Sequence, residues 1–354
     1  MRMNWLLAFI PLAFVLQRLQ AEPIIVFGAA GIAIVPLAKI MEQATDTLAD
    51  YLGPTYGGLL SATMGNAPEL IIGISALNNG LIEVLKGSIV GSILGTLLFG
   101  LGITMIAGGI QKPIQTFDGH MVKMNSSLLL LATFGLIIPA VFQFSAKAEA
   151  EISLRISTLL LLVYLASLVF TLKLKREATV LGPGDGHVIA ETTSKTSDGQ
   201  PRWSRNRALI TLIGVASLLA IVSDLLTDSI LPAADAMGLT PVFAGIFLLA
   251  LVGNIPQYMN SVAFASRNRM TLALSINLGS TTQLVLLVAP LLVILGQFAG
   301  HPMNLLFSQF ELVGIILCVT ITRHLISDNS SSWLEGIFLV AVYLMLGVGF
   351  YYQP

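Results

Sequence analysis

The sequence predicts an all-α polytopic membrane protein of about eleven transmembrane helices, one helix followed by two five-helix repeats of inverted topology. The 354-residue chain is 55% hydrophobic and 10% charged, whereas a typical soluble domain is about 25% charged. Its apolar residues gather in segments of roughly the 20 residues that a spanning helix needs. A short polar motif interrupts two of these segments, at Gly65-Asn66-Ala67-Pro68-Glu69 and at Gly253-Asn254-Ile255-Pro256-Gln257.

Eleven apolar segments predict the spanning helices in chain order. They cover residues 4–20, 23–41, 57–78, 83–107, 124–144, 152–172, 207–230, 240–265, 271–296, 304–326 and 333–352. The first segment could be a secretory signal that is cleaved after Ala21. Leu19 is large for the position three residues before that cleavage point, where a small residue is typical, so we expect a retained helix.

The basic residues orient these helices. Of the 18 lysines and arginines, four fall on the side opposite the N-terminus, and the rest fall on the N-terminal side. Those four are Arg18, Lys86, Lys147 and Arg155. Cytoplasmic loops carry the excess of positive charge in membrane proteins. We therefore expect a cytoplasmic N-terminus and a C-terminus on the opposite side. A bacterial plasma membrane is the expected location, with a vacuolar or thylakoid membrane as the alternative.

One long polar segment divides the chain. We expect an N-terminal helix at 1–22, a first repeat at 23–172, a polar cytoplasmic linker at 173–206 and a second repeat at 207–354. Because each repeat has five helices, an odd number, matching repeats must cross the membrane in opposite orientations. The motifs support this division, since each is followed at the same distance by a Gly-Ser pair, Gly91-Ser92 or Gly279-Ser280. Such duplicated polar interruptions point to the binding site of a transporter.

The first motif offers oxygen ligands for a hard cation. Asn66 and Glu69 are three residues apart and share a helix face. Pro68 has no N–H, so the backbone carbonyl of Met64 loses its helical partner. An ionisable group at membrane depth is a functional-site hypothesis by default. Glu69 can take either a proton or a cation, one excluding the other, which is the basis of exchange.

The second motif offers similar ligands without the negative charge. Asn254, Gln257 and the backbone carbonyl of Val252 repeat the arrangement, and we expect Glu69 and Gln257 to be the metal ligands. The helices after the motifs add side-chain oxygens or amides on one face each. These are Ser92 and Thr96 in the first repeat and Ser280 and Gln283 in the second.

Acidic residues also gather near the ends of two helices, Glu42, Asp46 and Asp50 in one and Asp224, Asp228 and Asp235 in the other. They could be solvated helix ends, a vestibule that attracts cations, or a proton relay.

Other classes of protein fit poorly. The single cysteine, Cys318, excludes an internal disulfide and a cysteine-rich metal site. The four histidines lack HExxH spacing, and no GxSxG nucleophile elbow is present. We therefore expect no enzyme, no cofactor and no nucleic-acid partner. A cation channel is a further alternative, but a duplicated fold with a central titratable site favours alternating access.

Several segments together resemble the calcium/proton exchanger family of the calcium/cation antiporter superfamily. They are Leu52-Gly53-Pro54-Thr55, Gly65-Asn66-Ala67-Pro68-Glu69-Leu70, Gly91-Ser92-Ile93-Leu94-Gly95, Asn125-Ser126-Ser127-Leu128-Leu129, Gly253-Asn254, Gly279-Ser280-Thr281-Thr282-Gln283 and Ser332-Trp333-Leu334-Glu335-Gly336. The resemblance implies eleven helices with a regulatory first helix, embedded in a lipid bilayer. It implies that the calcium ion is the transported substrate, expelled from the cytosol in exchange for protons. By resemblance Glu69 is the first signature glutamate, and Ser92, Ser280 and Gln283 line the site.

The second signature departs from the family pattern. The family has glutamate and histidine where this chain has Gln257 and Tyr258, and asparagine is usual at Thr96. An amide can coordinate calcium through its oxygen, but it cannot take up a proton near neutral pH. Three interpretations follow: a calcium/proton exchanger with altered coupling, an antiporter for a different cation such as a monovalent one, or a transport-impaired member of the family.

Overall fold

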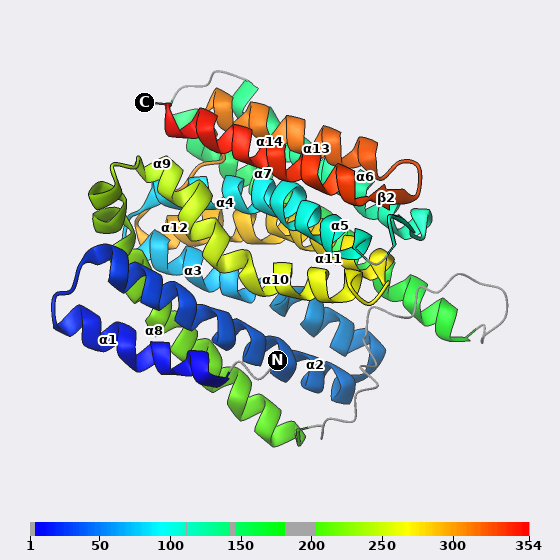
Figure 1. Cartoon of the computed structure of the whole chain (residues 1–354), viewed down its shortest axis with the longest axis horizontal. Coiled ribbons are helices and arrows are strands. Elements are labelled where there is room, and N and C mark those ends of the chain that lie inside the picture. The colour runs from blue at the N-terminus through cyan, green and yellow to red at the C-terminus, as the bar shows by residue number, and fades with distance from the viewer. Residues whose placement is uncertain (1–3, 111, 142–145, 181–202, 354) are drawn as a thin grey trace.

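The computed structural model describes residues 4–110, 112–141, 146–180 and 203–353. Apart from one short pair of strands, the regular structure of these residues is helical (Figure 1). The helices of the first half are η1 (Asn4–Ala8), α1 (Phe9–Arg18), α2 (Pro23–Met64), α3 (Ala67–Asn78), α4 (Ile82–Leu94), η2 (Gly95–Gly100), α5 (Leu101–Gly109), α6 (Gly119–Val141) and α7 (Ala146–Val180). The second half contains α8 (Arg205–Met237), α9 (Pro241–Phe243), η3 (Ala244–Leu249), α10 (Ala250–Ala265), α11 (Met270–Gln283), η4 (Leu284–Val288), α12 (Ala289–Ala299), α13 (Gln309–Leu325) and α14 (Trp333–Tyr351). The strands β1 (Ile114–Thr116) and β2 (Ser330–Ser332) pair antiparallel.

The prediction of an all-α polytopic membrane protein is confirmed. Eight helices in the described residues are long and apolar enough to cross a membrane, and the shorter apolar helices Trp5–Arg18 and Ala67–Asn78 add to them. Three of the eight are continuous rods in which a π-helical turn, η2, η3 or η4, joins two α-helical pieces. Such turns insert an extra residue and occur often at functional sites. The count of eleven spans stays a prediction.

The predicted helix 57–78 is wrong as a single rod. The residues before the first motif belong to α2, which is bent at Gly53 with φ +77° and ψ −179°. A Cβ atom on Gly57 would lie 2.1 Å from the carbonyl oxygen of Ala49. Residues eight apart in a straight helix are about 12 Å apart, so the chain doubles back at Gly53. It then stops at Met64, and α3 starts as a new helix at Ala67.

The helices build two hydrophobic cores. One surrounds the paired helices α2 and α8, with α1 against them, and it includes Leu37 and Leu226. The other surrounds α4, α11 and α12 and includes Leu94 and Val285. In Figure 1, α1, α2 and α8 form a layer along one side of the molecule, while α13 and α14 lie on the opposite side. The cavity described below lies between α2 of the first layer and the helices α3, α10 and α11.

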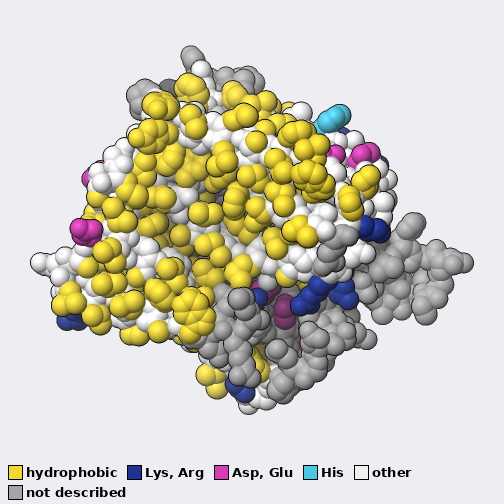
Figure 2. All heavy atoms as spheres, viewed as in Figure 1, with side chains coloured by type: hydrophobic (Ala, Val, Ile, Leu, Met, Phe, Trp, Pro, Cys, Tyr) yellow, Lys and Arg dark blue, Asp and Glu magenta, His cyan; other side chains and the backbone are white. Residues whose placement is uncertain are grey.

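The outer surface is apolar. Large hydrophobic side chains are exposed on helices throughout the molecule, for example Leu131, Phe298 and Met345. Figure 2 shows one broad face covered by hydrophobic side chains, with charged residues at its margins. Such a surface is stable against lipid but unusual for a protein surrounded by water.

Candidate functional site

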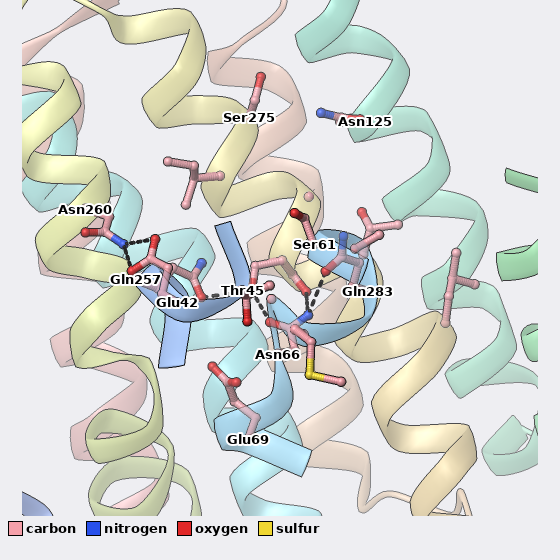
Figure 3. A pocket seen from close by; sticks show the side chains of 18 of the residues that line it. Glu42, Thr45, Ser61, Asn66, Glu69, Asn125, Gln257, Asn260, Ser275 and Gln283 are labelled. Atoms are coloured by element: carbon pink, nitrogen blue, oxygen red, sulfur yellow. Dashed lines mark hydrogen bonds between the residues drawn. The ribbon is translucent and has the colours of Figure 1, made fainter. Parts of the chain in front are cut away.

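A cavity of about 470 Å³ lies between α2, α3, α6, α7, α10 and α11. Six of the predicted site residues line it: Met64, Asn66, Glu69, Gln257, Ser280 and Gln283. Figure 3 shows the side chains of Asn66 and Glu69, at the start of α3, and those of Gln257 on α10 and Gln283 on α11 facing this space. The structure therefore brings the core of the first motif together with the polar end of the second.

The first motif forms the junction between two helices. Asn66 occupies the N-cap position of α3 with φ −114° and ψ 24°, Pro68 follows in the first turn, and Glu69 ends that turn. Proline is well suited to a first turn, where its missing N–H would have no helical partner. A helix N-terminus carries partial positive charge and stabilises an anion nearby. The carbonyl end of α2, which includes Met64, carries the opposite partial charge and suits a cation.

A hydrogen-bond network fixes the amides around the junction. The Nδ2 atom of Asn66 donates to Gln283 Oε1 at 3.1 Å and to the Ser280 carbonyl oxygen at 3.2 Å. The Ser280 hydroxyl lies 2.6 Å from Asn66 Oδ1 and 2.9 Å from Gln257 Oε1. Asn66 is only 2% exposed. These contacts link the end of α2 to α11.

The orientation of the Gln257 amide follows from hydrogen counting. A hydroxyl has a single hydrogen, so Ser280 cannot fully satisfy both Asn66 and Gln257. Among the residues that the structure describes, buried Gln257 Nε2 has no hydrogen-bond partner. The two ends of an amide are distinguished by their hydrogen bonds. Rotating this amide by half a turn lets Nε2 donate to Ser280 and Ser280 donate to Asn66. The Gln257 oxygen then faces away from Ser280 and is available to a ligand.

Glu69 has no hydrogen-bond partner for one of its carboxylate oxygens. Its Oε2 atom is buried and unpartnered within the described residues. A Cβ atom on Gly253 would lie 3.7 Å from Glu69 Cγ, so the carboxylate lies directly against the second motif. An ionised carboxylate that is desolvated without a partner is costly. A bound proton or cation would remove that cost.

The second motif does not break its helix, although the sequence predicts similar ligands from both copies. α10 runs unbroken from Ala250 through Pro256 to Ala265. The difference lies in the partners of the two asparagines. Asn254 Nδ2 donates to the Ala250 carbonyl of its own helix at 2.7 Å and to Ser92 Oγ at 2.9 Å, whereas Asn66 bonds to another helix.

Four predicted site residues do not line the cavity: Asn254, Ser92, Thr96 and Val252. Thr96 donates to Asn254 Oδ1 at 3.3 Å, so Asn254, Ser92 and Thr96 form a buried group of their own. Val252 packs its side chain against Gly31 of α2. The arrangement is nonetheless reciprocal, because the asparagine of each motif contacts the serine of the other half's Gly-Ser pair. The division into two repeats stays a prediction.

Two residues of the cavity wall, Thr45 and Asn260, were not predicted as site residues. For two others, Glu42 and Asp46, the sequence left more than one interpretation. Thr45 and Asn260 line the cavity together with Glu42 and Asp46. Asn260 is three residues after Gln257, and this spacing could have placed it on the same face of α10. Tyr258, the other departure from the family pattern, is 5% exposed and does not line the cavity. Its ring meets Phe99 edge to face at 5.8 Å.

No group of three histidine, cysteine, aspartate or glutamate side chains converges in the part of the chain that the structure describes. A cation at this site would therefore be held by one carboxylate, Glu69, together with the Gln257 amide oxygen, the Met64 carbonyl and neighbouring polar oxygens. Hard cations accept such mixed oxygen ligands.

Comparisons with known proteins identify the family of this chain. The family model described as sodium/calcium exchanger protein matches residues 22–173 and 207–352. The chain is 36% identical to a Ca²⁺/H⁺ antiporter of Aphanothece halophytica over 99% of this chain and 96% of that protein. It is 31% identical to a vacuolar calcium ion transporter of Schizosaccharomyces pombe over 99% of this chain and 85% of that protein. The solved structure of native YfkE superimposes with a TM-score of 0.82 at 30% identity, covering 98% of each chain. The resemblance seen in the motifs is confirmed, and the chain belongs to the sodium/calcium exchanger protein family.

Proposed function

We propose that this protein is a secondary active transporter that exchanges calcium ions for protons by alternating access. The observation that carries the proposal is the unpartnered Glu69 carboxylate oxygen, which lies at a helix junction in a cavity with the Gln257 amide. A hard cation and a proton compete for the same carboxylate. Relatives that are named as Ca²⁺/H⁺ antiporters over nearly the whole chain support the choice of cation.

The cavity represents the inward-facing state. Asn125, Thr171 and Ser275 line it near helix ends that the basic-residue count assigns to the cytoplasm. In this state Glu69 gives up its proton and binds the cation with Gln257, Asn66 and the Met64 carbonyl. The central site then opens to the other side, where protons displace the cation and return with the protein. The expected setting is a bacterial plasma membrane with a cytoplasmic N-terminus.

Gln257 alters the coupling. Among the inner residues Asn66, Glu69, Gln257, Ser280 and Gln283, only Glu69 has a side chain that can bind and release a proton. Each cation taken up therefore displaces one proton rather than the two that a pair of glutamates would release. Exchange of one divalent cation for one proton moves a net positive charge. The smaller negative charge of the site also lowers its affinity for calcium.

An antiporter for a monovalent cation is the second candidate. The specific observation is again the single carboxylate, because one negative charge balances one monovalent cation and makes exchange for one proton electroneutral. A transport-impaired member of the family is the remaining alternative.

The test is cation uptake into proteoliposomes with an imposed proton gradient. We expect calcium uptake that depends on the gradient and that manganese reduces more than sodium or potassium does. Sodium or potassium transport in place of calcium transport would favour the second candidate. Cation flux that persists after the proton gradient has collapsed would indicate a channel. Absence of any uptake by correctly folded protein would reject exchange.

A further inference from the structure

The α2 wall of the cavity carries a second set of oxygen ligands. Glu42, Thr45 and Asp46 all line the cavity, and their spacings of three and four residues place Glu42 beside both of the others on the helix. Two carboxylates one helical turn apart repel each other. In the described part of the chain neither forms an ion pair with a basic residue, since the ion pair found there joins Arg155 and Glu151. A cation bound between them would relieve the repulsion.

Thr45 points to a ligand independently of the carboxylates. Thr45 is 4% exposed, and its hydroxyl oxygen has no hydrogen-bond partner within the described residues. A threonine inside a helix commonly bonds to the carbonyl four residues earlier. Thr47, on the same helix, does so by donating to the Gln43 carbonyl at 2.8 Å. The Thr45 hydroxyl is thus buried, unused and part of the cavity wall.

Asn260 fixes the orientation of the first carboxylate. Its Nδ2 atom lies 2.7 Å from Glu42 Oε1 and 2.8 Å from Glu42 Oε2. Figure 3 shows Asn260 and Glu42 bonded beside Gln257, and Thr45 lines the same cavity. Because Asn260 and Gln257 share a face of α10, the α2 wall and the central site are adjacent parts of the same cavity.

The same sequence pattern on α8 has different partners. Thr45-Asp46-Thr47-Leu48-Ala49-Asp50 recurs as Ser223-Asp224-Leu225-Leu226-Thr227-Asp228. On α8 both carboxylates accept hydrogen bonds from α3, Asp224 from the Ser75 hydroxyl at 2.5 Å and Asp228 from Asn79 at 3.1 Å. On α2, Asp46 has no hydrogen bond to the described residues and faces the cavity. Its lone pairs are available to a ligand.

We propose that Glu42, Thr45 and Asp46 form an accessory binding site for a divalent cation, in the inward-facing cavity and separate from Glu69. This inference adds a binding step to the proposed function. It rests on that function in one respect, because it assumes that the cation bound here moves next to Glu69. Carboxylate and hydroxyl oxygens are suitable ligands for calcium, and a site with only a few protein ligands retains water on the ion. Two carboxylates also raise the local concentration of cations and hence the rate of capture.

The experiment measures calcium binding to the purified full-length protein by equilibrium dialysis. Glu69→Gln removes the central carboxylate, and we expect this variant to keep one bound calcium ion per chain. Adding Asp46→Asn to this variant should weaken its calcium binding by about 10-fold or more, because one of the two carboxylate ligands is lost. Adding Asp235→Asn instead removes an exposed carboxylate that is not in the cavity, and it should leave the binding unchanged.

Two results would overturn the inference. Glu69→Gln could bind no calcium, or the variant with Asp46→Asn could bind as tightly as Glu69→Gln alone. If the variant with Asp46→Asn does not fold, Glu69→Gln with Thr45→Val replaces it, and unchanged binding there has the same meaning. Transport by the unmodified protein is measured alongside. If the unmodified protein shows gradient-driven uptake but the binding experiment finds no accessory site, only this inference is rejected. If the unmodified protein shows no uptake, the proposed function is rejected and the binding result stays valid.

Discussion

Replacing Gln257 by glutamate should change the number of protons exchanged for each cation. The inner site holds a single carboxylate, Glu69, so we expect the unmodified protein to exchange one calcium ion for one proton and to move one net positive charge. Gln257→Glu adds a second group that takes a proton when the cation leaves. Exchange of one calcium ion for two protons moves no net charge.

The size of the effect follows from the charge that is moved. Moving one elementary charge across 100 mV is worth about 2.3 kcal/mol, and about 1.4 kcal/mol corresponds to a tenfold change in an equilibrium ratio. A potential of 100 mV should therefore shift the equilibrium calcium ratio of the unmodified protein by on the order of 40-fold. The variant should show no shift. A gradient of one pH unit should change the ratio about 10-fold for one proton and about 100-fold for two.

The assay is calcium accumulation in proteoliposomes whose potential is clamped with potassium and valinomycin. Gln257→Asn retains a neutral amide and should keep the voltage dependence of the unmodified protein, which controls for simple disturbance of the site. If potential shifts the calcium ratio equally in the unmodified protein and in Gln257→Glu, the assignment of coupling to this position is wrong. Indifference of the unmodified protein to potential would also refute the count of one proton.

Three further predictions concern the central site and its packing. Glu69→Gln should abolish exchange, and since it removes an unpartnered buried charge it should melt no lower than the unmodified protein; exchange by this variant would contradict the assignment. Asn66→Ala should cost about 1–3 kcal/mol in thermal unfolding, because buried partners on α11 lose their hydrogen bonds. Gly91→Ala should lower the melting temperature, since its Cβ would lie 2.1 Å from the Ile246 carbonyl oxygen, an overpacking that costs about 1–3 kcal/mol or more. Gly279→Ala, the equivalent change in the other half, meets nothing within 4 Å and should not destabilise.

The helical segments could be predicted because hydrocarbon length leaves a strong signal in composition. Whether each of the two motifs interrupts its helix could not be predicted from the sequence. Both contain glycine, asparagine and proline in the same order, yet only the first interrupts its helix. The outcome depends on tertiary partners, since Asn66 bonds to α11 while Asn254 bonds to its own backbone and to Ser92. The ligands were predicted from residues that share one face of a single helix. That prediction therefore included Asn254, Ser92 and Thr96, which do not line the cavity, and it did not include the α2 residues that do.

The difference between the motifs matches the difference in their charges. Glu69 lies in the first turn of α3, where the helix N-terminus stabilises a carboxylate while no cation is bound. Gln257 lies in the middle of an unbroken helix, where no such stabilisation exists, and a neutral amide needs none. The junction also provides backbone carbonyls at the end of α2, so the part of the site that carries the charge also carries the free backbone oxygens. In the proposed mechanism a proton and a cation then compete at Glu69, while Gln257 supplies an oxygen ligand and, through Ser280, helps to hold Asn66 in place.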